Sequence, residues 1–214
     1  MNEKKIDASI VQDIADYYSS KITAFGATPQ GVDWNGSEGQ TQRFNQLTKM
    51  LPEELDFSIA DLGCGYGALY GYLTEHYRNF NYYGYDISEQ MLVHAINRYK
   101  NVNNAKFVHS SIISTPVDFS IASGIFNVRQ QHNDAEWLSY IIKTLDSMNE
   151  NSRLGFSFNC LTSYSEPSKM KSNLYYADPL VIFDLCKRKY AMNVALLHDY
   201  GLYEFTIIVR KDNE

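Results

Sequence analysis

The sequence predicts an α/β protein of three layers, in which a mostly parallel, seven-stranded sheet lies between two layers of helices. The first observation is that short apolar runs alternate with segments of helical spacing over residues 57–159, a pattern typical of βαβ units. The second is that the last two apolar runs, 193–198 and 203–210, are separated by a very short connection. Such a connection joins antiparallel strands, so we expect the sheet to end in an antiparallel C-terminal hairpin.

The segment before the sheet is predicted to be helical. Apolar residues recur at helical spacing over 6–25, where Gly26 ends the helix, and a second helix fits 37–51, where Pro52 ends it. The chain of 214 residues suits one domain. We therefore expect a single domain over 1–214, with a helical segment over residues 1–52 and the core over residues 53–214.

The core is predicted to contain five parallel strands, at 57–62, 81–85, 105–109, 119–123 and 153–159. The intervening helices are predicted at 66–77, 88–99 and 135–148, with Ser88 and Asp134 as N-caps of the last two. Asp178 and Pro179 are a typical start for a helix that continues to about residue 190. Right-handed crossovers would place the loops after the parallel strands along one edge of the sheet, where ligands bind in such folds.

Composition and charge narrow the class of protein. Hydrophobic residues make up 44% and charged residues 21%, which predicts an ordinary core. The net charge of −6 disfavours binding to long nucleic acid, because phosphate contacts supply most non-specific affinity. The N-terminus lacks a signal-peptide pattern, and no apolar run approaches the roughly 18 residues of a transmembrane helix. We therefore expect a cytoplasmic protein without a nucleic-acid or membrane partner.

The three cysteines, Cys64, Cys160 and Cys186, are far apart and form no CxxC pair. This spacing predicts buried free thiols rather than a zinc site or a disulfide framework. No other cluster of metal-ligating residues stands out, and so no metal is expected.

The stretch Asp61–Leu69, written DLGCGYGAL, is the strongest functional signal. Its alternate glycines behind an apolar strand predict a turn at which a ligand approaches the backbone. A P-loop would end in Lys-Ser/Thr, where this chain has Ala-Leu, so a nucleoside triphosphatase is disfavoured. The dinucleotide pattern GxGxxG/A fits Gly63, Gly65 and Ala68 with Asp86 as the ribose ligand, which leaves an NAD-dependent oxidoreductase as an alternative.

Two features of this loop favour a different ligand. Asp61 directly precedes the glycines, and Gly67 comes one residue early for a pyrophosphate-binding loop. With Asp86 in YYGYDIS and the closing hairpin, the chain resembles the class I S-adenosylmethionine-dependent methyltransferases over about residues 37–210. GATPQGVDWN and ASGIFNV are also similar to a group of bacterial methyltransferases. The resemblance implies a Rossmann-like methyltransferase fold, S-adenosylmethionine as cofactor, S-adenosylhomocysteine as its product, and a small-molecule substrate. It also implies that residues 1–52 form a helical cap over the cofactor and the active site.

The resemblance also implies roles for individual residues at the cofactor. Asp86 would accept both ribose hydroxyls, although an alternative is that it only caps the following helix. Asp61 would balance the ammonium group, and Arg43 would bind the carboxylate unless it lies on a solvated helix face. Ser111 replaces the usual acidic adenine ligand, and Ser110 and Ser111 could equally be turn residues. The expected cofactor-binding residues are Arg43, Asp61, Gly63, Cys64, Gly65, Gly67, Asp86, Ile87, Ser111 and Ser123.

Candidates for substrate contact lie in the N-terminal segment and after the fourth and fifth predicted strands. They are Trp34, Asn127, Arg129, Asn159, Tyr164, Tyr175 and Tyr176. The connection over residues 160–178 is longer than usual, which predicts an active-site lid. His132 is the candidate catalytic base if the acceptor must lose a proton, and the alternative is a capping or surface histidine.

The expected reaction is an in-line displacement, in which the protein mainly orients the acceptor against the methyl group. The Asn/Asp-Pro-Pro-Tyr type of tetrapeptide used by amino-methylating DNA enzymes is absent at 123–126, which argues against amino methylation of adenine or cytosine in nucleic acid. A non-catalytic module that binds a cofactor or a partner on the same fold is a further alternative. A monomer or a homodimer is expected, and the sequence does not identify the methyl acceptor.

Overall fold

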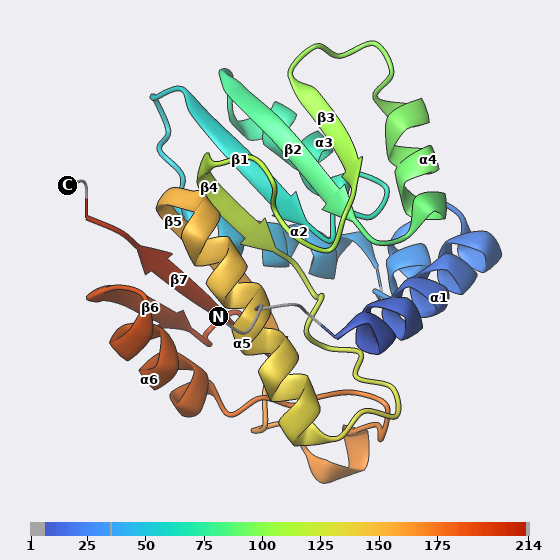
Figure 1. Cartoon of the computed structure of the whole chain (residues 1–214), viewed down its shortest axis with the longest axis vertical. Helices are drawn as coiled ribbons and strands as arrows, with labels where there is room; N and C mark the ends of the chain where they lie inside the picture. The colour runs from blue at the N-terminus through green and yellow to red at the C-terminus, as the bar shows by residue number, and fades with distance from the viewer. Residues whose placement is uncertain (1–6, 35, 213–214) are drawn as a thin grey trace.

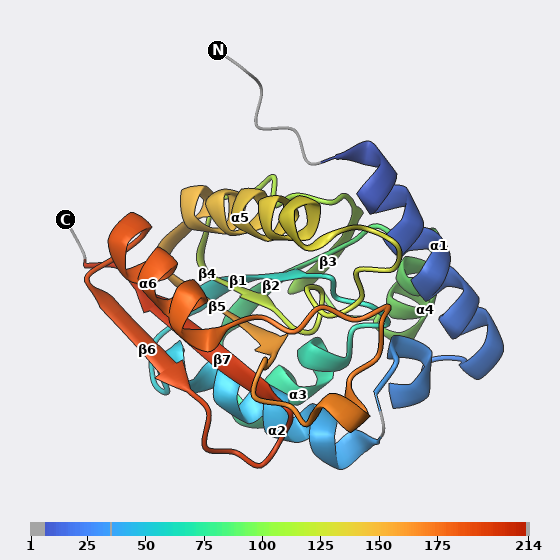
Figure 2. The ribbon, with the colours of Figure 1, turned by 90° about the horizontal axis from the view of Figure 1, so that it is seen from below.

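The computed structural model describes residues 7–34 and 36–212. Its centre is a seven-stranded sheet of order β3-β2-β1-β4-β5-β7-β6, with helices on both faces (Figures 1 and 2). Strands β1 to β5 pair in parallel, whereas β7 lies between β5 and β6 and runs antiparallel to both. The predicted fold class, a mostly parallel sheet with an antiparallel C-terminal hairpin, is confirmed.

The observed elements lie within a few residues of the predicted ones. The strands are β1 (Phe57–Leu62), β2 (Phe80–Asp86), β3 (Ala105–His109), β4 (Val117–Ala122), β5 (Ser152–Leu161), β6 (Asn193–Leu197) and β7 (Glu204–Arg210). The α-helices are α1 (Ala8–Phe25), α2 (Ser37–Leu47), α3 (Ala68–His76), α4 (Glu89–Arg98), α5 (Asp134–Asn151) and α6 (Pro179–Lys189), and the short 3-10 helices are η1 (Pro29–Val32), η2 (Thr48–Met50) and η3 (Pro167–Lys169). The predicted helix start at Ile6 lies outside the described residues.

Two hydrophobic clusters hold the helices on the sheet. The cluster on one face contains Trp137 of α5, Ile182 of α6 and Ile14 of α1, and the cluster on the other contains Leu47 of α2 and Leu73 of α3. Figure 2 shows α5 on one side of the sheet and α2 and α3 on the other. Because both faces are covered, the central strands are buried along almost their whole length, as in other parallel sheets.

Local capping explains where several helices begin. Ser88 caps α4 as predicted, since its side chain accepts a hydrogen bond from the backbone N–H of Met91. For α5 the N-cap is Asn133 rather than the predicted Asp134, because Asn133 forms a capping box with Glu136. The predicted helix over 37–51 is interrupted as well, since α2 ends at Leu47 and continues as η2.

The three cysteines are free and buried, in agreement with the prediction. Within the part of the chain that the structure describes, no helix is both long and apolar enough to cross a membrane.

Candidate functional site

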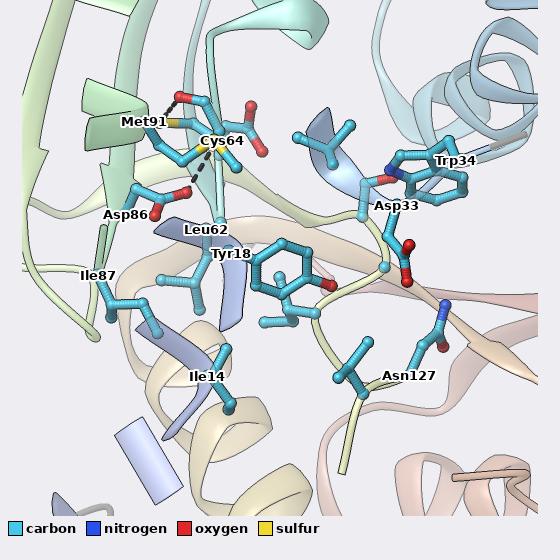
Figure 3. A pocket seen from close by; sticks show the side chains of 18 of the residues that line it. Ile14, Tyr18, Asp33, Trp34, Leu62, Cys64, Asp86, Ile87, Met91 and Asn127 are labelled. Atoms are coloured by element: carbon cyan, nitrogen blue, oxygen red, sulfur yellow. Dashed lines mark hydrogen bonds between the residues drawn. The ribbon is translucent and has the colours of Figure 1, made fainter. Parts of the chain in front are cut away.

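A cavity of about 270 Å³ opens at the carboxyl ends of β1, β2 and β4 (Figure 3). The loops after these three strands form one wall. The N-terminal segment from α1 to α2 forms a second wall, and the loop before α6 adds Lys171 and Leu174. The site is therefore assembled from the core and from the two segments that the sequence predicted as cap and lid.

The glycine-rich loop is tightly fixed to the end of β2. Gly63 and Gly65 have left-handed φ values of +79° and +54°, which glycine adopts without strain. The backbone N–H of Gly63 donates to the carbonyl of Tyr85 at 2.7 Å, and that of Gly65 donates to Asp86 Oδ2 at 2.8 Å. A Cβ atom on Gly63 would lie only 2.2 Å from Ile125 Cγ2, so both torsion and space require glycine at this position.

Asp86 joins the glycine loop to the start of α4. Its Oδ2 accepts the Gly65 N–H, and its Oδ1 accepts the N–H of Ser88 at 2.8 Å. The side chain is 7% exposed and lines the cavity. Burial raises the pKa of Asp86, and the backbone hydrogen bonds oppose that rise. Because each carboxylate oxygen can accept a second hydrogen bond, Asp86 can also bind a ligand.

Asp61 is a buried carboxyl group at the cavity wall, with 2% exposure. The hydroxyl of Tyr82 donates to its Oδ2 at 2.6 Å. Burial raises the pKa of Asp61 to about 7, against the lowering effect of the Tyr82 hydrogen bond. A cation bound beside Asp61 would favour its ionised form, because opposite charges stabilise each other at short range.

Serine side chains also contribute to the wall that the loops after β1, β2 and β4 form. The Oγ of Ser123 is buried and has no hydrogen-bond partner among the described residues, which costs free energy unless a ligand supplies the partner. Ser111 also lines the cavity. The hydroxyl of Ser110 bonds within its own turn, because it donates to the carbonyl of Ile112 and accepts its N–H. Ser110 is therefore a turn residue.

Arg43 lines the cavity but is already paired. Its Nε and Nη2 each lie 2.8 Å from an oxygen of Glu204, and its guanidinium carbon lies 3.6 Å from the ring centroid of Trp34. Glu204 Oε2 also accepts from Asn159 Nδ2 at 2.5 Å, and Asn159 Oδ1 accepts the N–H of Gly124 at 2.8 Å. Arg43 thus belongs to a chain of contacts that holds Trp34, rather than to a solvated helix face.

The structure brings most predicted cofactor residues together and scatters most predicted substrate residues. Those that line the cavity are Trp34, Arg43, Asp61, Gly63, Cys64, Gly65, Asp86, Ile87, Ser111, Ser123 and Asn127. Those that do not line it are Gly67, Arg129, His132, Asn159, Tyr164, Tyr175 and Tyr176.

Two of these exceptions are needed for packing. A Cβ atom on Gly67 would lie 2.7 Å from Tyr99 Cε2, and the hydroxyl of Tyr99 donates to the carbonyl of Gly67 at 2.9 Å. Gly67 is therefore required for the approach of α3 to Tyr99. Asn159 is fully buried, and its side chain forms hydrogen bonds with the Glu204 carboxylate and with the backbone N–H of Gly124. Neither residue is among those that line the cavity.

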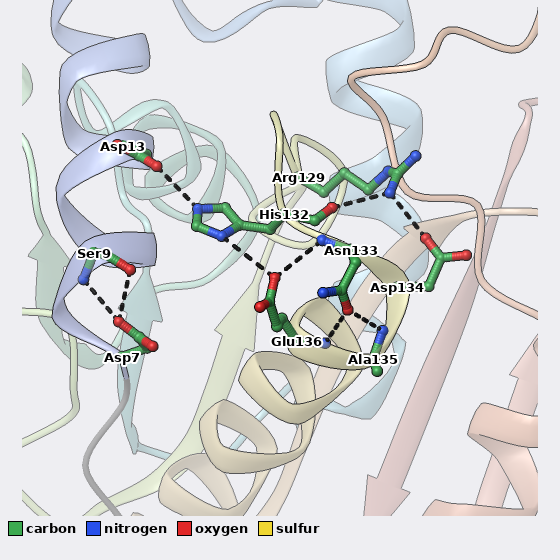
Figure 4. Close-up of polar contacts among 9 residues, drawn as sticks. All are labelled: Asp7, Ser9, Asp13, Arg129, His132, Asn133, Asp134, Ala135 and Glu136. Carbon is green, nitrogen blue, oxygen red and sulfur yellow. Dashed lines mark hydrogen bonds and ion pairs between the residues drawn. The ribbon is translucent and has the colours of Figure 1, made fainter.

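His132, the predicted catalytic base, lies between α1 and α5 and is not among the residues that line the cavity (Figure 4). His132 Nε2 lies 3.0 Å from Asp13 Oδ2, and His132 Nδ1 lies 3.9 Å from Glu136 Oε2. The imidazole therefore connects α1 to the start of α5 on the outside of the cavity, in line with the alternative of a surface histidine.

Arg129 fastens the loop before α6 instead of facing the substrate. Its Nε and Nη2 donate to the carbonyls of Leu174 and Ser172, each at 3.1 Å. The backbone N–H of Tyr175 donates to the carbonyl of Asn127 at 2.8 Å. Two other predicted substrate residues also point elsewhere: the hydroxyl of Tyr176 accepts the N–H of Lys171, and Tyr164 is 67% exposed beside His198.

Sequence reasoning missed the part of the wall that α1 and η1 supply. Val11, Ile14 and Tyr18 of α1 line the cavity, as does Asp33 at the end of η1. Val11, Ile14 and Tyr18 recur at helical spacing in the sequence. An apolar helix face ordinarily packs on a core, however, so this spacing did not indicate a cavity wall. No sequence pattern indicated that Asp33 lines the cavity, because the position of its side chain depends on the left-handed turn after η1.

The fold and the motifs together define a Rossmann-like protein of the methyltransferase class. Residues 59–151 match a family described as "Methyltransferase domain". Over 155 residues, which are 72% of this chain and 93% of the relative, the chain is 57% identical to "Putative methyltransferase Rv1506c" of Mycobacterium tuberculosis. The chain therefore belongs to this family of methyltransferases, and the predicted class is confirmed.

Solved structures are similar in fold at low sequence identity. One is magnesium protoporphyrin IX methyltransferase from Synechocystis PCC 6803 with bound S-adenosylhomocysteine, with a TM-score of 0.68 and 14% identity over 94% of this chain and 99% of that chain. Another is N-methyltransferase NodS from Bradyrhizobium japonicum WM9 with the same ligand, with a TM-score of 0.65 and 13% identity over 92% and 97% of the two chains. Family membership decides against the NAD-dependent oxidoreductase alternative.

Proposed function

We propose that this methyltransferase transfers the methyl group of S-adenosylmethionine to a small molecule that enters the cavity at the sheet edge. The observation that carries the proposal is a cavity with two chemically distinct ends. The cofactor end consists of Asp61, Gly63, Gly65, Asp86 and Ser123, and the acceptor end consists of Asp33, Trp34, Asn127, Lys171 and Leu174.

The cofactor end fits a ligand that carries positive charge and no phosphate. Of the described residues that line the cavity, four are acidic and two, Arg43 and Lys171, are basic. Glu204 already neutralises Arg43, so the wall has little positive charge with which to bind a phosphate dianion. When bound, S-adenosylmethionine supplies a methyl group that its sulfonium already activates for displacement.

The chain's own groups would bind that cofactor through ordinary polar contacts. The Asp86 carboxylate would accept hydrogen bonds from the ribose hydroxyls, and such bonds to an ionised acceptor are strong. Asp61 would balance the ammonium group, and the Oγ of Ser123 would gain the partner that it lacks. Glycines 63 and 65 keep the backbone open to the amino-acid portion.

The acceptor end orients the substrate and excludes water. Trp34 after η1 and Leu174 of the loop before α6 form apolar walls. In-line displacement requires the attacking atom to lie opposite the leaving group, and holding it there is the main catalytic contribution. Residues 1–52 would thus act as the cap and residues 160–178 as the lid over this end. An acceptor that fits among these walls is a small molecule.

Calorimetric titration with S-adenosylhomocysteine, followed by transfer from methyl-labelled S-adenosylmethionine to a cell extract, tests the proposal. We expect saturable binding and label in the dialysable fraction of the extract. Absence of binding would contradict the cofactor assignment. Label confined to macromolecules would contradict a small acceptor, and binding without transfer to any fraction would favour a non-catalytic module.

A further inference from the structure

A carboxylate and an amide face each other at the acceptor end. Figure 3 shows the Asp33 carboxylate and the Asn127 amide directed toward one another, away from Asp86. We propose that Asp33 and Asn127 hold a hydroxyl group of the methyl acceptor between them, so that the acceptor is a hydroxylated small molecule. The inference rests on the proposed function and specifies the substrate class of the same site.

Asp33 is held in place as an ionised hydrogen-bond acceptor. Its backbone is left-handed, with φ of +63°, a conformation that costs an ordinary residue energy but that Asp and Asn tolerate. The hydroxyl of Tyr17 donates to Oδ2 and the ammonium of Lys21 to Oδ1, each at 2.7 Å. These bonds keep the pKa of Asp33 below its ordinary value although burial opposes them. Lone pairs remain on both oxygens for a ligand.

Asn127 offers the complementary donor. Its Oδ1 accepts the backbone N–H of Leu161 at 3.0 Å, and its backbone carbonyl accepts the N–H of Tyr175. Because Oδ1 is used in this way, the amide nitrogen is the atom that faces the cavity. One hydrogen bond therefore holds the side chain of Asn127, and another holds its backbone.

An ionised acceptor opposite an N–H donor selects for a group that both donates and accepts. A hydroxyl donates to the Asp33 carboxylate and accepts from the Asn127 amide. An ammonium group offers donors only, which leaves the Asn127 N–H unmatched. A carboxylate or phosphate offers acceptors only and is repelled by Asp33. The hydroxyl is the group that satisfies both side chains.

The surroundings suit the rest of such an acceptor. Trp34, stacked on Arg43, provides a flat wall next to Asp33, and Val128 and Leu174 add apolar surface. Lys171 also lines the cavity, and its charge contributes to the low pKa of Asp33. The hydroxyl of Tyr18 points to the same side of the cavity in Figure 3, where it can donate or accept.

The experiment uses trideuteromethyl S-adenosylmethionine and the dialysable fraction of an extract of cells that express the protein. Mass spectrometry identifies the labelled product, and the purified acceptor then serves to compare variants. Asp33→Asn retains the left-handed turn but removes the charge. Asn127→Asp retains the oxygen that accepts the Leu161 N–H but removes the donor. Asp16→Asn, on the exposed face of α1 beside Gln12, is the matched control.

We expect the acceptor to carry a hydroxyl group. Asp33→Asn and Asn127→Asp should each lower kcat/KM for it by about tenfold to a hundredfold, the range for hydrogen bonds to charged groups. S-adenosylhomocysteine affinity should stay within about twofold of wild type in both, and Asp16→Asn should behave as wild type.

A labelled acceptor without hydroxyl groups, or unchanged kcat/KM in both variants, would overturn the inference and leave the proposed function standing. A loss of S-adenosylhomocysteine affinity in Asp33→Asn would also overturn it, because Asp33 would then belong to the cofactor end. No transfer by the wild type to any dialysable compound would overturn the proposed function itself and the inference with it.

Discussion

At the cofactor end of the cavity, Asp61, Asp86 and Ser123 come from the carboxyl ends of the strands of the sheet or from the residues directly after them. Two backbone N–H groups hold the Asp86 carboxylate. At the acceptor end, Asn127 comes from the loop after β4, but the other groups come from segments that pack on the sheet edge from outside. Asp33 is held by two side chains of α1, and Leu174 is held by a guanidinium.

The difference matters for function because rigid strands can position a common cofactor, whereas added segments can change without disturbing the sheet. Loops and terminal segments generally vary most among proteins with one scaffold. Cofactor binding and acceptor recognition should therefore respond to different substitutions.

Asp86→Ala should weaken S-adenosylhomocysteine binding by about 100-fold or more, because two charge-assisted hydrogen bonds to the ribose and the tie to Gly65 are lost together. Calorimetry measures the effect. Asp118→Ala is the matched control, since it removes a carboxylate that accepts the backbone N–H of Ser58 at the opposite end of the strands. Equal affinity in Asp86→Ala and Asp118→Ala would contradict the assignment of the cofactor end.

Gly124→Ala should disturb the acceptor end through Trp34. The new Cβ would lie 2.6 Å from Trp34 Cζ2 at a φ of +79°. Gly201→Ala provides the control, because Gly201 has a φ of +69° and nothing within 4 Å of the added atom. We expect Gly124→Ala to lower unfolding free energy by about 1–3 kcal/mol more than Gly201→Ala in denaturant titrations, as typical of overpacking. Equal losses would mean that Trp34 does not pack on this glycine.

Cofactor affinity should depend on pH through Asp61. Its pKa is about 7 in the folded chain, and a bound ammonium group favours the ionised form. Affinity for S-adenosylhomocysteine should therefore rise as pH increases from about 6 to about 8, and fall as Asp61 takes up a proton at lower pH. Asp61→Asn should remove this dependence. A pH profile that is the same in wild type and Asp61→Asn would place the ammonium group elsewhere.

Asp13→Asn should have the smallest effect. The Asp13 contact with His132 joins α1 to α5, but the Asp13 side chain is 54% exposed, and exposed ion pairs contribute about 0–1 kcal/mol. We expect stability to fall by less than about 1 kcal/mol. S-adenosylhomocysteine affinity should change less than about threefold, because α1 remains held by Ser19 on Ser88. A larger loss of affinity would show that this contact alone keeps α1 on the cavity.

The sequence predicted that Asp61, the glycine loop and Asp86 lie together because these residues are local to two motifs. These motifs lie at the ends of strands, namely at Gly63, Gly65 and Asp86. The alternation of apolar runs with segments of helical spacing is enough to locate these strand ends in the sequence. The acceptor end could not be predicted in the same way, because tertiary contacts decide it. Arg43 is drawn to Glu204, which lies 161 positions away, and Arg129 turns toward carbonyls of the loop before α6. No local pattern distinguishes such side chains from those that face a ligand.

A crystal structure of the complex with S-adenosylhomocysteine tests the separation of the two ends most directly. The account predicts the ribose against the Asp86 carboxylate and the ammonium group on the side of Asp61. It also predicts Asp33 and Asn127 free of contact with the ligand and open to the acceptor. S-adenosylhomocysteine bound to Asp33, or located away from Asp86, would contradict it.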